Sequence, residues 1–263
     1  MIYRKDNYYD KLKNFTKSNF EVVTDFDRTI TGSNSLTTWG ILNDTDILPK
    51  EYTFERNSLY NYYRPIELDV EIDEAVKMGA MEDWYNKHLD LLKKYSLSRD
   101  NIIDLFSNKE VMEFRNGFVD FYNYLDSLNV RFNIISSGIG DFVLKFLEIN
   151  NCSFVNLTVT SNFLNFDRHG HVIGFRDSLI HNLNKHNFSL EKTNKDYVLL
   201  LGDQLSDVMM VEGFDRDKIL AVAYVPEDNM NELESFKDVF DVVFTNDEGF
   251  DILLKDLKSV LDK

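Results

Sequence analysis

Cysteine and proline are both scarce in this chain, and each scarcity excludes a class of protein. Among the 263 residues are one cysteine, Cys152, and three prolines. A single cysteine cannot form an intramolecular disulfide or a cysteine-based zinc site, which excludes a small secreted domain stapled by disulfides. So few prolines, without any low-complexity run, leave little room for a flexible linker between domains.

Long apolar runs are missing as well. No segment approaches the roughly 20 consecutive apolar residues that a membrane-spanning helix needs. The N-terminal stretch MIYRKDNYYDKLKNF carries charges throughout, unlike the apolar centre of a signal peptide. We therefore expect a globular protein of the cytoplasm with no membrane partner.

Positive charge is the scarcer sign. The chain has 29 Lys and Arg against 45 Asp and Glu, which gives a net charge of −16. Such a negative surface repels phosphate backbones, so nucleic acid is not an expected partner. A small anionic substrate is compatible with this charge, because a metal ion or a helix terminus can reverse the sign locally. Hydrophobic residues make up 43%, including 21 Phe and 13 Tyr, enough for one large packed domain or one domain with an insertion.

Short apolar runs bounded by turn residues recur along the chain, at 20–25, 130–138, 154–160, 196–203, 219–225 and 241–245. Continuous runs of this kind are typical of parallel strands that helices cover on both faces. Helical patterns lie between them, at 118–128, 141–149, 207–211 and 250–261. This alternation predicts an α/β fold with a doubly wound parallel sheet.

Two segments depart from the alternation. Residues 32–112 contain no convincing strand, and their apolar positions have helical spacing: Ile72, Ala75, Val76, Gly79 and Ala80, then Trp84, His88, Leu91 and Leu92. This segment is far longer than a usual βα connection, so we expect a helical cap over 32–112 inserted after the first strand, with a core of 1–31 and 113–263. A smaller insertion, 162–175, alternates around His169 and Gly170 and predicts a β-hairpin.

Clusters of polar residues come directly after three of the predicted strands. In an open α/β sheet, ligands bind at the carboxyl ends of the strands, beside a topological switch point. Residues far apart in the sequence should therefore converge on one edge of the sheet. These residues are Asp25 and Asp27, then Ser136, Ser137 and Gly138, then Asp203 and Asp207.

The four carboxylates in this set indicate a metal. At ~4 Å and an effective dielectric constant near 20, each pair of like charges costs roughly 4 kcal/mol. A divalent cation removes that cost, and a ligand set of oxygens alone favours Mg²⁺ over zinc. Ser136 offers a hydroxyl, and Ser137 and Gly138 offer amides at a predicted helix N-terminus, which is suited to an anion. The sequence therefore predicts a site for a metal ion and a phosphate.

Each cluster also has an ordinary structural explanation. An Asp-x-Asp after a strand is commonly a turn or a helix cap, Ser-Ser-Gly is a common loop, and an isolated Lys185 would be a surface lysine. The order of the clusters argues otherwise: an acid pair follows the first strand, a hydroxyl the next, then the lysine, then two further acids. We favour the functional interpretation because all of these parts occur together.

In this order the motifs resemble those of the haloacid-dehalogenase-like hydrolases. DFDRT matches the first motif, Ser136 the second, Lys185 the third and GDQLSD the fourth. Further segments resemble the cytosolic pyrimidine 5′-nucleotidase (type III) family, from about Phe20 to Gly213: YYRPIELD, MEDWYNKH, FRNG, SSGIGDF, SNFLNFD and GFRDSLIHNLNKH.

The resemblance implies a role for each motif residue. Asp25 would be the nucleophile, and Asp27 the general acid and base. Asp25, the Asp27 carbonyl and Asp203 would bind Mg²⁺, while Asp207 would lie behind them and orient metal waters or Lys185. Ser136, the Ser137 amide and Lys185 would hold the phosphate oxygens.

Two residues of the predicted cap are expected to contact the base of a nucleotide. Glu67 lies in the Pro-Ile-Glu segment that resembles the family's base-recognition element, although an exposed helix glutamate is an equal alternative. His88 stands where better-known relatives carry a serine, which leaves the preferred base open. Arg28 replaces an apolar residue of some relatives, with no evident consequence.

The sequence as a whole favours a Mg²⁺-dependent 5′-nucleotidase that hydrolyses nucleoside 5′-monophosphates, pyrimidine ones first, through an aspartyl-phosphate. We expect a monomer whose partner is the small-molecule nucleotide. Two alternatives remain: a phosphatase for another small phosphate monoester, like phosphoserine phosphatase, and a non-catalytic nucleotide-binding relative. Transfer of the phosphoryl group to an acceptor nucleoside is also compatible with such an intermediate.

Overall fold

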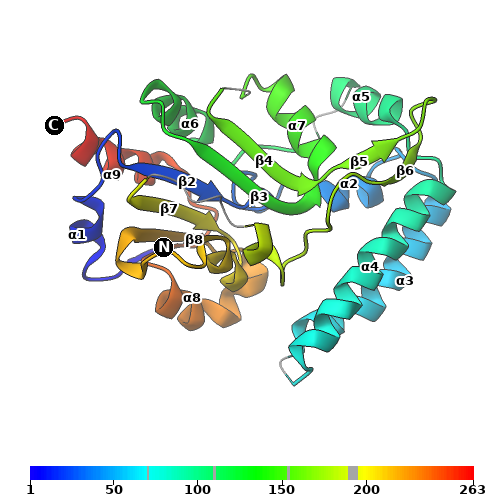
Figure 1. Ribbon diagram of the computed structural model, residues 1–263, viewed down its shortest axis with the longest axis horizontal. Coiled ribbons are helices and arrows are strands. Elements are labelled where there is room, and N and C mark those ends of the chain that lie inside the picture. The colour runs from blue at the N-terminus through cyan, green and yellow to red at the C-terminus, as the bar shows by residue number, and fades with distance from the viewer. Residues whose placement is uncertain (70, 109–110, 153–154, 189–194) are drawn as a thin grey trace.

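A sheet of seven strands lies at the centre of the molecule, whose computed structural model describes residues 1–69, 71–108, 111–152, 155–188 and 195–263 (Figure 1). The strand order is β1-β9-β8-β7-β2-β3-β4, and every neighbouring pair is parallel except β1 with β9. The bounds are β1 (Ile2–Arg4), β2 (Phe20–Thr24), β3 (Phe132–Ile139), β4 (Leu157–Asn162), β7 (Tyr197–Gly202), β8 (Ile219–Tyr224) and β9 (Val242–Phe244). This confirms the predicted doubly wound α/β fold, and of the strand expected at 154–160, residue 154 lies outside the described residues.

Both faces of the sheet are apolar. Successive residues of a strand point to opposite faces, so a strand that is apolar throughout contributes to both. In β7, Leu199 and Leu201 belong to one hydrophobic cluster and Val198 and Leu200 to the other. The first cluster packs against α1 (Tyr8–Leu12), α6 (Phe118–Ser127), α7 (Gly140–Ile149) and α9 (Asp251–Leu261). The second packs against α8 (Leu233–Val239), which Figure 1 shows on the side of the sheet opposite α6 and α7. Two covered faces explain the continuous apolar runs in the sequence.

In the segment 32–112, which breaks the alternation, the described residues form four helices: α2 (Thr38–Asp44), α3 (Lys50–Leu68), α4 (Glu74–Lys94) and α5 (Arg99–Asn108). Helices α3 and α4 lie side by side and extend away from the sheet (Figure 1). An isolated bridge between Thr31 and Phe114, and a bond from the Gly32 amide to the Glu113 carbonyl, join the two ends of the segment. We propose that this junction separates a core of 1–31 and 113–263 from a cap of 32–112.

The apolar stripe predicted along α4 is buried only in part. Trp84, His88, Leu91 and Leu92 are buried as expected. The earlier positions are not: Ile72 precedes the helix, and Ala75, Val76 and Gly79 are not buried. The first half of α4 lies beyond the sheet beside α3, where much of its surface stays in solvent.

Three smaller features complete the comparison with the sequence prediction, and the first of them agrees with it. The insertion at 162–175 forms the expected antiparallel hairpin, β5 (Leu164–Phe166) with β6 (Val172–Phe175), turning at Gly170. The helix expected at 207–211 is instead a 3-10 helix, η2 (Leu205–Val211). The edge strand β1 has three residues, too few for a detectable pattern. Among the described residues, no helix has the length and apolar character needed to cross a membrane.

Candidate active site

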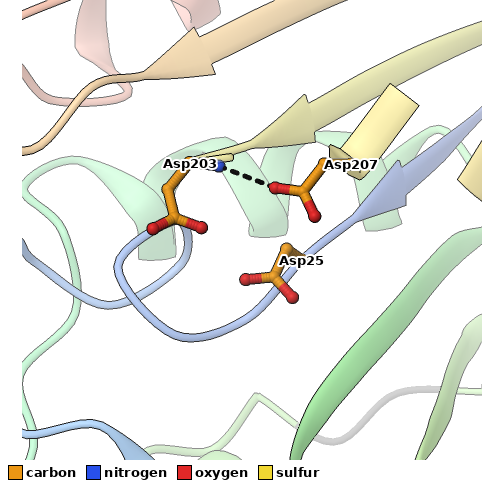
Figure 2. A group of neighbouring side chains, drawn as sticks. All are labelled: Asp25, Asp203 and Asp207. Atoms are coloured by element: carbon orange, nitrogen blue, oxygen red, sulfur yellow. Dashed lines mark hydrogen bonds between the residues drawn. The ribbon is translucent and has the colours of Figure 1, made fainter. Parts of the chain in front are cut away.

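The carboxylates of Asp25, Asp203 and Asp207 meet where β2 and β7 end (Figure 2). From β2 the chain continues outward to β3 and β4, and on the other side β7 leads to β8 and β9. The two strands are thus the neighbours at which the winding direction reverses, and loops diverge from such a point to leave a crevice. Ligand oxygens of the three buried residues all lie within 4.8 Å of one another.

Lys185 joins two of these carboxylates. Its Nζ atom lies 2.6 Å from Oδ1 of Asp25 and 2.7 Å from Oδ1 of Asp207. Lys185 begins the 3-10 helix η1 (Lys185–Phe188) and is itself buried. Burial disfavours the ammonium form, but the attraction of Asp207 and Asp25 outweighs it, and the pKa of Lys185 is raised.

Asp207 is fully engaged by the protein. Its Oδ1 accepts from Lys185, and its Oδ2 accepts from the amides of Asp203 and Gln204 at 3.0 and 2.9 Å. These bonds tighten the chain after β7 into the 3-10 turn and hold Asp203 at the strand end. Asp207 therefore fixes the positions of Lys185 and Asp203.

The protein does not fully neutralise the carboxylates of Asp25 and Asp203. Burial first, and then Asp207 among the neighbouring carboxylates, raise the pKa of Asp25 to about 7 against the pull of Lys185. Burial and the neighbouring carboxylates raise the pKa of Asp203 well above its usual range. Among the described residues, no group donates to Asp25 Oδ2, to the Asp203 carboxylate or to the carbonyl of Asp27. These oxygens fit a hard divalent cation, which would relieve the repulsion between the acids.

Asp27 is held apart from this cluster by the cap. The Thr38 amide, at the start of α2, lies 3.0 Å from Oδ1 of Asp27, and the Thr38 hydroxyl donates to Oδ2 at 2.8 Å. A first-turn amide has no partner within its own helix, so it is available to a carboxylate. Burial raises the pKa of Asp27 to about 6, while the two bonds from Thr38 oppose the rise. A carboxyl group that titrates in this range can exchange a proton near neutral pH.

The serine cluster lies at the end of β3 rather than at a helix N-terminus. Helix α7 begins at Gly140, two residues later than the expected anion-binding amides. The Gly138 amide donates to the Ser136 hydroxyl at 3.0 Å, so the strand end folds back on itself. Ser136 and Ser137 still line the same cavity as Asp25.

One cavity of about 380 Å³ is lined by these core groups, which we call its phosphate end, and by cap residues, which we call its base end. Its core lining includes Asp25, Asp27, Ser136, Ser137, Asn182 and Asp203. Its cap lining includes Trp39, Arg56, Tyr60, Arg64, Glu67, Trp84, Tyr85 and His88. The acids and the aromatic side chains thus face a common space, large enough for a mononucleotide.

Glu67 is not an exposed helix residue. Its side chain is 8% exposed, and both carboxylate oxygens are engaged, Oε2 by Arg64 and Oε1 by the Asn182 side chain at 2.9 Å. This geometry excludes the solvated alternative considered for Glu67.

His88 is buried between aromatic rings. Its ring lies 5.1 Å from that of Trp39 and 5.8 Å from that of Trp84, centroid to centroid. Burial, with a smaller contribution from Arg56, lowers the pKa of His88 to about 3, so the ring is neutral at physiological pH. Among the described residues nothing hydrogen-bonds its Nε2 atom.

Several residues at the site were missed in the sequence. Thr38 had no signal, because only the folded chain places α2 against Asp27. Trp39 and Asn182 line the cavity and were not singled out, although Asn182 lies three positions before Lys185.

The fold is that of the haloacid-dehalogenase-like hydrolases. A similar fold occurs in a substrate-bound phosphoserine phosphatase structure, with a TM-score of 0.56 and 17% identity over 90% of this chain and 97% of that one. The family model of pyrimidine 5′-nucleotidases (UMPH-1) matches residues 22–261, and the chain belongs to that family. It is therefore a phosphoric monoester hydrolase of the 5′-nucleotidase class.

The descriptions of two similar proteins mention compounds with different bases. The 7-methylguanosine phosphate-specific 5′-nucleotidase of Drosophila melanogaster is 29% identical over 258 residues, covering 92% of this chain and 80% of the relative. The crystal structure of cytosolic 5′-nucleotidase IIIB bound to cytidine has a TM-score of 0.83 and 25% identity, covering 99% of this chain and 93% of that chain. These comparisons confirm the predicted enzyme class and leave the base to be assigned.

Proposed function

We propose that this enzyme hydrolyses nucleoside 5′-monophosphates through an aspartyl-phosphate at Asp25, with Mg²⁺ as its cofactor. The observation that carries the proposal is the single cavity, in which a Lys185-linked acid cluster faces an aromatic cap. A phosphate at the acid end and a flat base at the cap end would fill the two parts of that space.

The first half of the reaction forms the intermediate. The Asp25 carboxylate attacks phosphorus, and the bond from phosphorus to the 5′ oxygen of the nucleoside breaks. Asp27 gives its proton to that oxygen, and the nucleoside leaves as a neutral alcohol. Its raised pKa, to about 6, leaves part of the Asp27 population protonated for this step.

The second half releases phosphate. Asp27, now a carboxylate, removes a proton from water, and the water oxygen attacks the phosphorus of the aspartyl-phosphate. The bond between phosphorus and Asp25 breaks, which restores both acids and gives inorganic phosphate. Thr38 keeps Asp27 directed to the same place in both halves, since it binds both carboxylate oxygens.

Mg²⁺ would be held by Asp25, Asp203 and the Asp27 carbonyl, with Asp207 behind them. When bound, it supplies positive charge to the phosphate oxygens, whose negative charge dominates the transition state. Lys185, the Ser136 hydroxyl and the Ser137 amide would bind the other oxygens. Hydrogen bonds to Asp25 and Asp207 fix the position of the Lys185 ammonium group.

For the base we propose a pyrimidine first, read by Glu67 and His88 from the cap. A specific observation also favours a second candidate, 7-methylguanosine phosphate. The cavity presents the rings of Trp39, Trp84 and Tyr85, and a positively charged base gains from aromatic faces more than a neutral base does. The name of the fly relative points the same way. We place the reaction in the cytoplasm, in keeping with the name of the similar cytosolic enzyme.

The test is phosphate release from CMP, UMP, GMP, AMP, 7-methylguanosine monophosphate, phosphoserine and p-nitrophenyl phosphate, with Mg²⁺ and then with chelator. We expect kcat/KM to be highest for one of the nucleotides, and activity to vanish in chelator and return with Mg²⁺. Preference for phosphoserine, or full turnover in chelator, would contradict the proposal.

A further inference from the structure

Asn182 connects the two ends of the cavity. Its Oδ1 atom accepts a hydrogen bond from the Ser137 hydroxyl at 3.0 Å. Its Nδ2 atom donates to Oε1 of Glu67 at 2.9 Å. Ser137 belongs to the core and Glu67 to α3 of the cap, 115 positions from Asn182 in the sequence. One amide side chain therefore bridges the phosphate end and the base end.

The turn that carries Asn182 is held without it. The Asn184 side chain accepts from the His181 amide and donates to the Leu179 carbonyl. The Asn162 side chain binds the amide and the carbonyl of Ile180 at 2.8 Å each. These bonds hold the backbone on both sides of Asn182. The Asn182 side chain, which lines the cavity, is therefore not needed to hold the turn.

The two partners of Asn182 are fixed as well. The Ser137 carbonyl accepts from Asn162 Nδ2 at 2.9 Å, from Trp39 Nε1 at 3.1 Å and from the Tyr85 hydroxyl at 3.4 Å. Glu67 is anchored by Arg64 one helical turn away. Because both partners are held, the Asn182 amide sets the distance between them rather than following a mobile group.

We propose that Asn182 is a positioning residue that sets the separation between Ser137 and Glu67, and hence between the bound phosphate and the bound base. This inference rests on the proposed nucleotidase function. A nucleotide spans both ends and depends on that separation, whereas p-nitrophenyl phosphate contacts the phosphate end without a base. Losing the bridge should therefore penalise nucleotides more than the baseless ester.

Asn182→Asp isolates the cap side of the bridge. The new carboxylate still accepts from Ser137, but it cannot donate to Glu67 and places a like charge opposite it. We expect kcat/KM for the best nucleotide to fall about 10- to 100-fold, and roughly ten times further than for p-nitrophenyl phosphate. The matched control is Asn187→Asp, the same change at an exposed position of the neighbouring 3-10 helix.

A second variant makes the test independent of folding defects. Glu67→Gln combined with Asn182→Asp reverses the polarity of the bond, since the amide introduced on α3 can donate to the carboxylate introduced opposite it. We expect this double variant to recover most of the loss that Asn182→Asp causes, measured against Glu67→Gln alone. Unfolding midpoints of all variants accompany the kinetics.

Three results decide between the possibilities. A larger loss for nucleotides than for the baseless ester, with recovery in the double variant, supports the inference. Equal losses on both substrates, or no recovery, overturn it while leaving the nucleotidase proposal standing. A wild-type enzyme that releases phosphate from p-nitrophenyl phosphate but from no nucleotide overturns the proposed function and the inference with it.

Discussion

The Nζ atom of Lys185 lies 2.6 Å from Oδ1 of Asp25, although 160 positions separate the two residues in the chain. Both side chains are buried, at 3% and 7% exposure. The pair places a cation beside the proposed nucleophile. Lys185 therefore neutralises part of the negative charge of the acid cluster. From the sequence we expect a metal ion alone to do this.

Replacing Lys185 with Met should therefore affect stability as well as activity. Removing one partner of a buried ion pair typically costs about 3–5 kcal/mol, because the other charge is left uncompensated. We expect a lower unfolding midpoint in chelator and a larger gain on adding Mg²⁺ than the wild type shows. Thermal unfolding with and without Mg²⁺ measures both effects. An unchanged midpoint in chelator would mean that Lys185 does not balance the cluster.

The two acids of the first motif should respond differently to the leaving group. Asp25→Asn removes the nucleophile and should abolish turnover of every substrate. Asp27→Asn keeps the nucleophile but loses the general acid, whose help is typically worth about 10²–10⁴-fold. We expect a severe loss with nucleotides and a milder one with p-nitrophenyl phosphate, whose leaving group needs no proton. Equal losses for Asp27→Asn on both substrates would contradict this division of roles.

Cap residues should determine which base is preferred without affecting the phosphoryl transfer itself. Glu67→Ala removes a charged hydrogen-bonding group, and kcat/KM for the preferred nucleotide should fall by about 1.5–3 kcal/mol, or roughly 10- to 150-fold. His88→Ser should reorder the bases rather than lower all rates together. The measurement is kcat/KM across the nucleotide panel and p-nitrophenyl phosphate. If Glu67→Ala depresses the baseless ester as strongly as the nucleotides, then Glu67 has no part in base recognition.

His88 should also make stability depend on pH. Its pKa is about 3 in the folded protein against 6.5 when unperturbed, because burial disfavours the charged ring. Between these values the unfolded chain binds a proton that the folded protein does not, so stability falls as the pH falls through 6.5. Acidification by two pH units from neutrality should cost about 2 kcal/mol through this group.

Urea unfolding at neutral pH and two units below tests this linkage in the wild type, in His88→Gln and in a matched control, His169→Gln on the exposed hairpin. Of these three proteins, we expect His88→Gln to lose the least stability on acidification. The same loss in His88→Gln and wild type would show that His88 takes up no proton on unfolding.

The features that could be predicted from the sequence are those that follow from the burial of side chains. The strands β7 and β8 are apolar at nearly every position and β2 is buried throughout, because both faces of the sheet are covered, and such runs stand out in a sequence. Asp25 and Asp203 follow directly on β2 and β7, so parallel pairing alone brings them together. The doubly wound fold was predicted correctly for the same reason.

What could not be predicted depends on side chains that meet only after folding. Thr38 contacts Asp27, and Asn182 contacts Glu67, across separations that no spacing rule describes. The stripe through Val76 on α4 has helical periodicity without a partner, and a pattern cannot show whether a partner exists. The 3-10 turn at 205–211 follows from the bonds that Asp207 accepts, which override the helical pattern.

The central claim is that Asp25 carries the phosphoryl group, and one experiment tests it most directly. Asp27→Asn is mixed with p-nitrophenyl phosphate and Mg²⁺, quenched in acid at successive times, digested, and mapped by mass spectrometry beside the wild type. Without its base, this variant should break down the intermediate slowly. We predict one phosphoryl group on the peptide that contains Asp25, labile to hydroxylamine and absent in chelator. Release of p-nitrophenol with no phosphoryl group on Asp25 at any time, or with the group on another residue, would contradict the account.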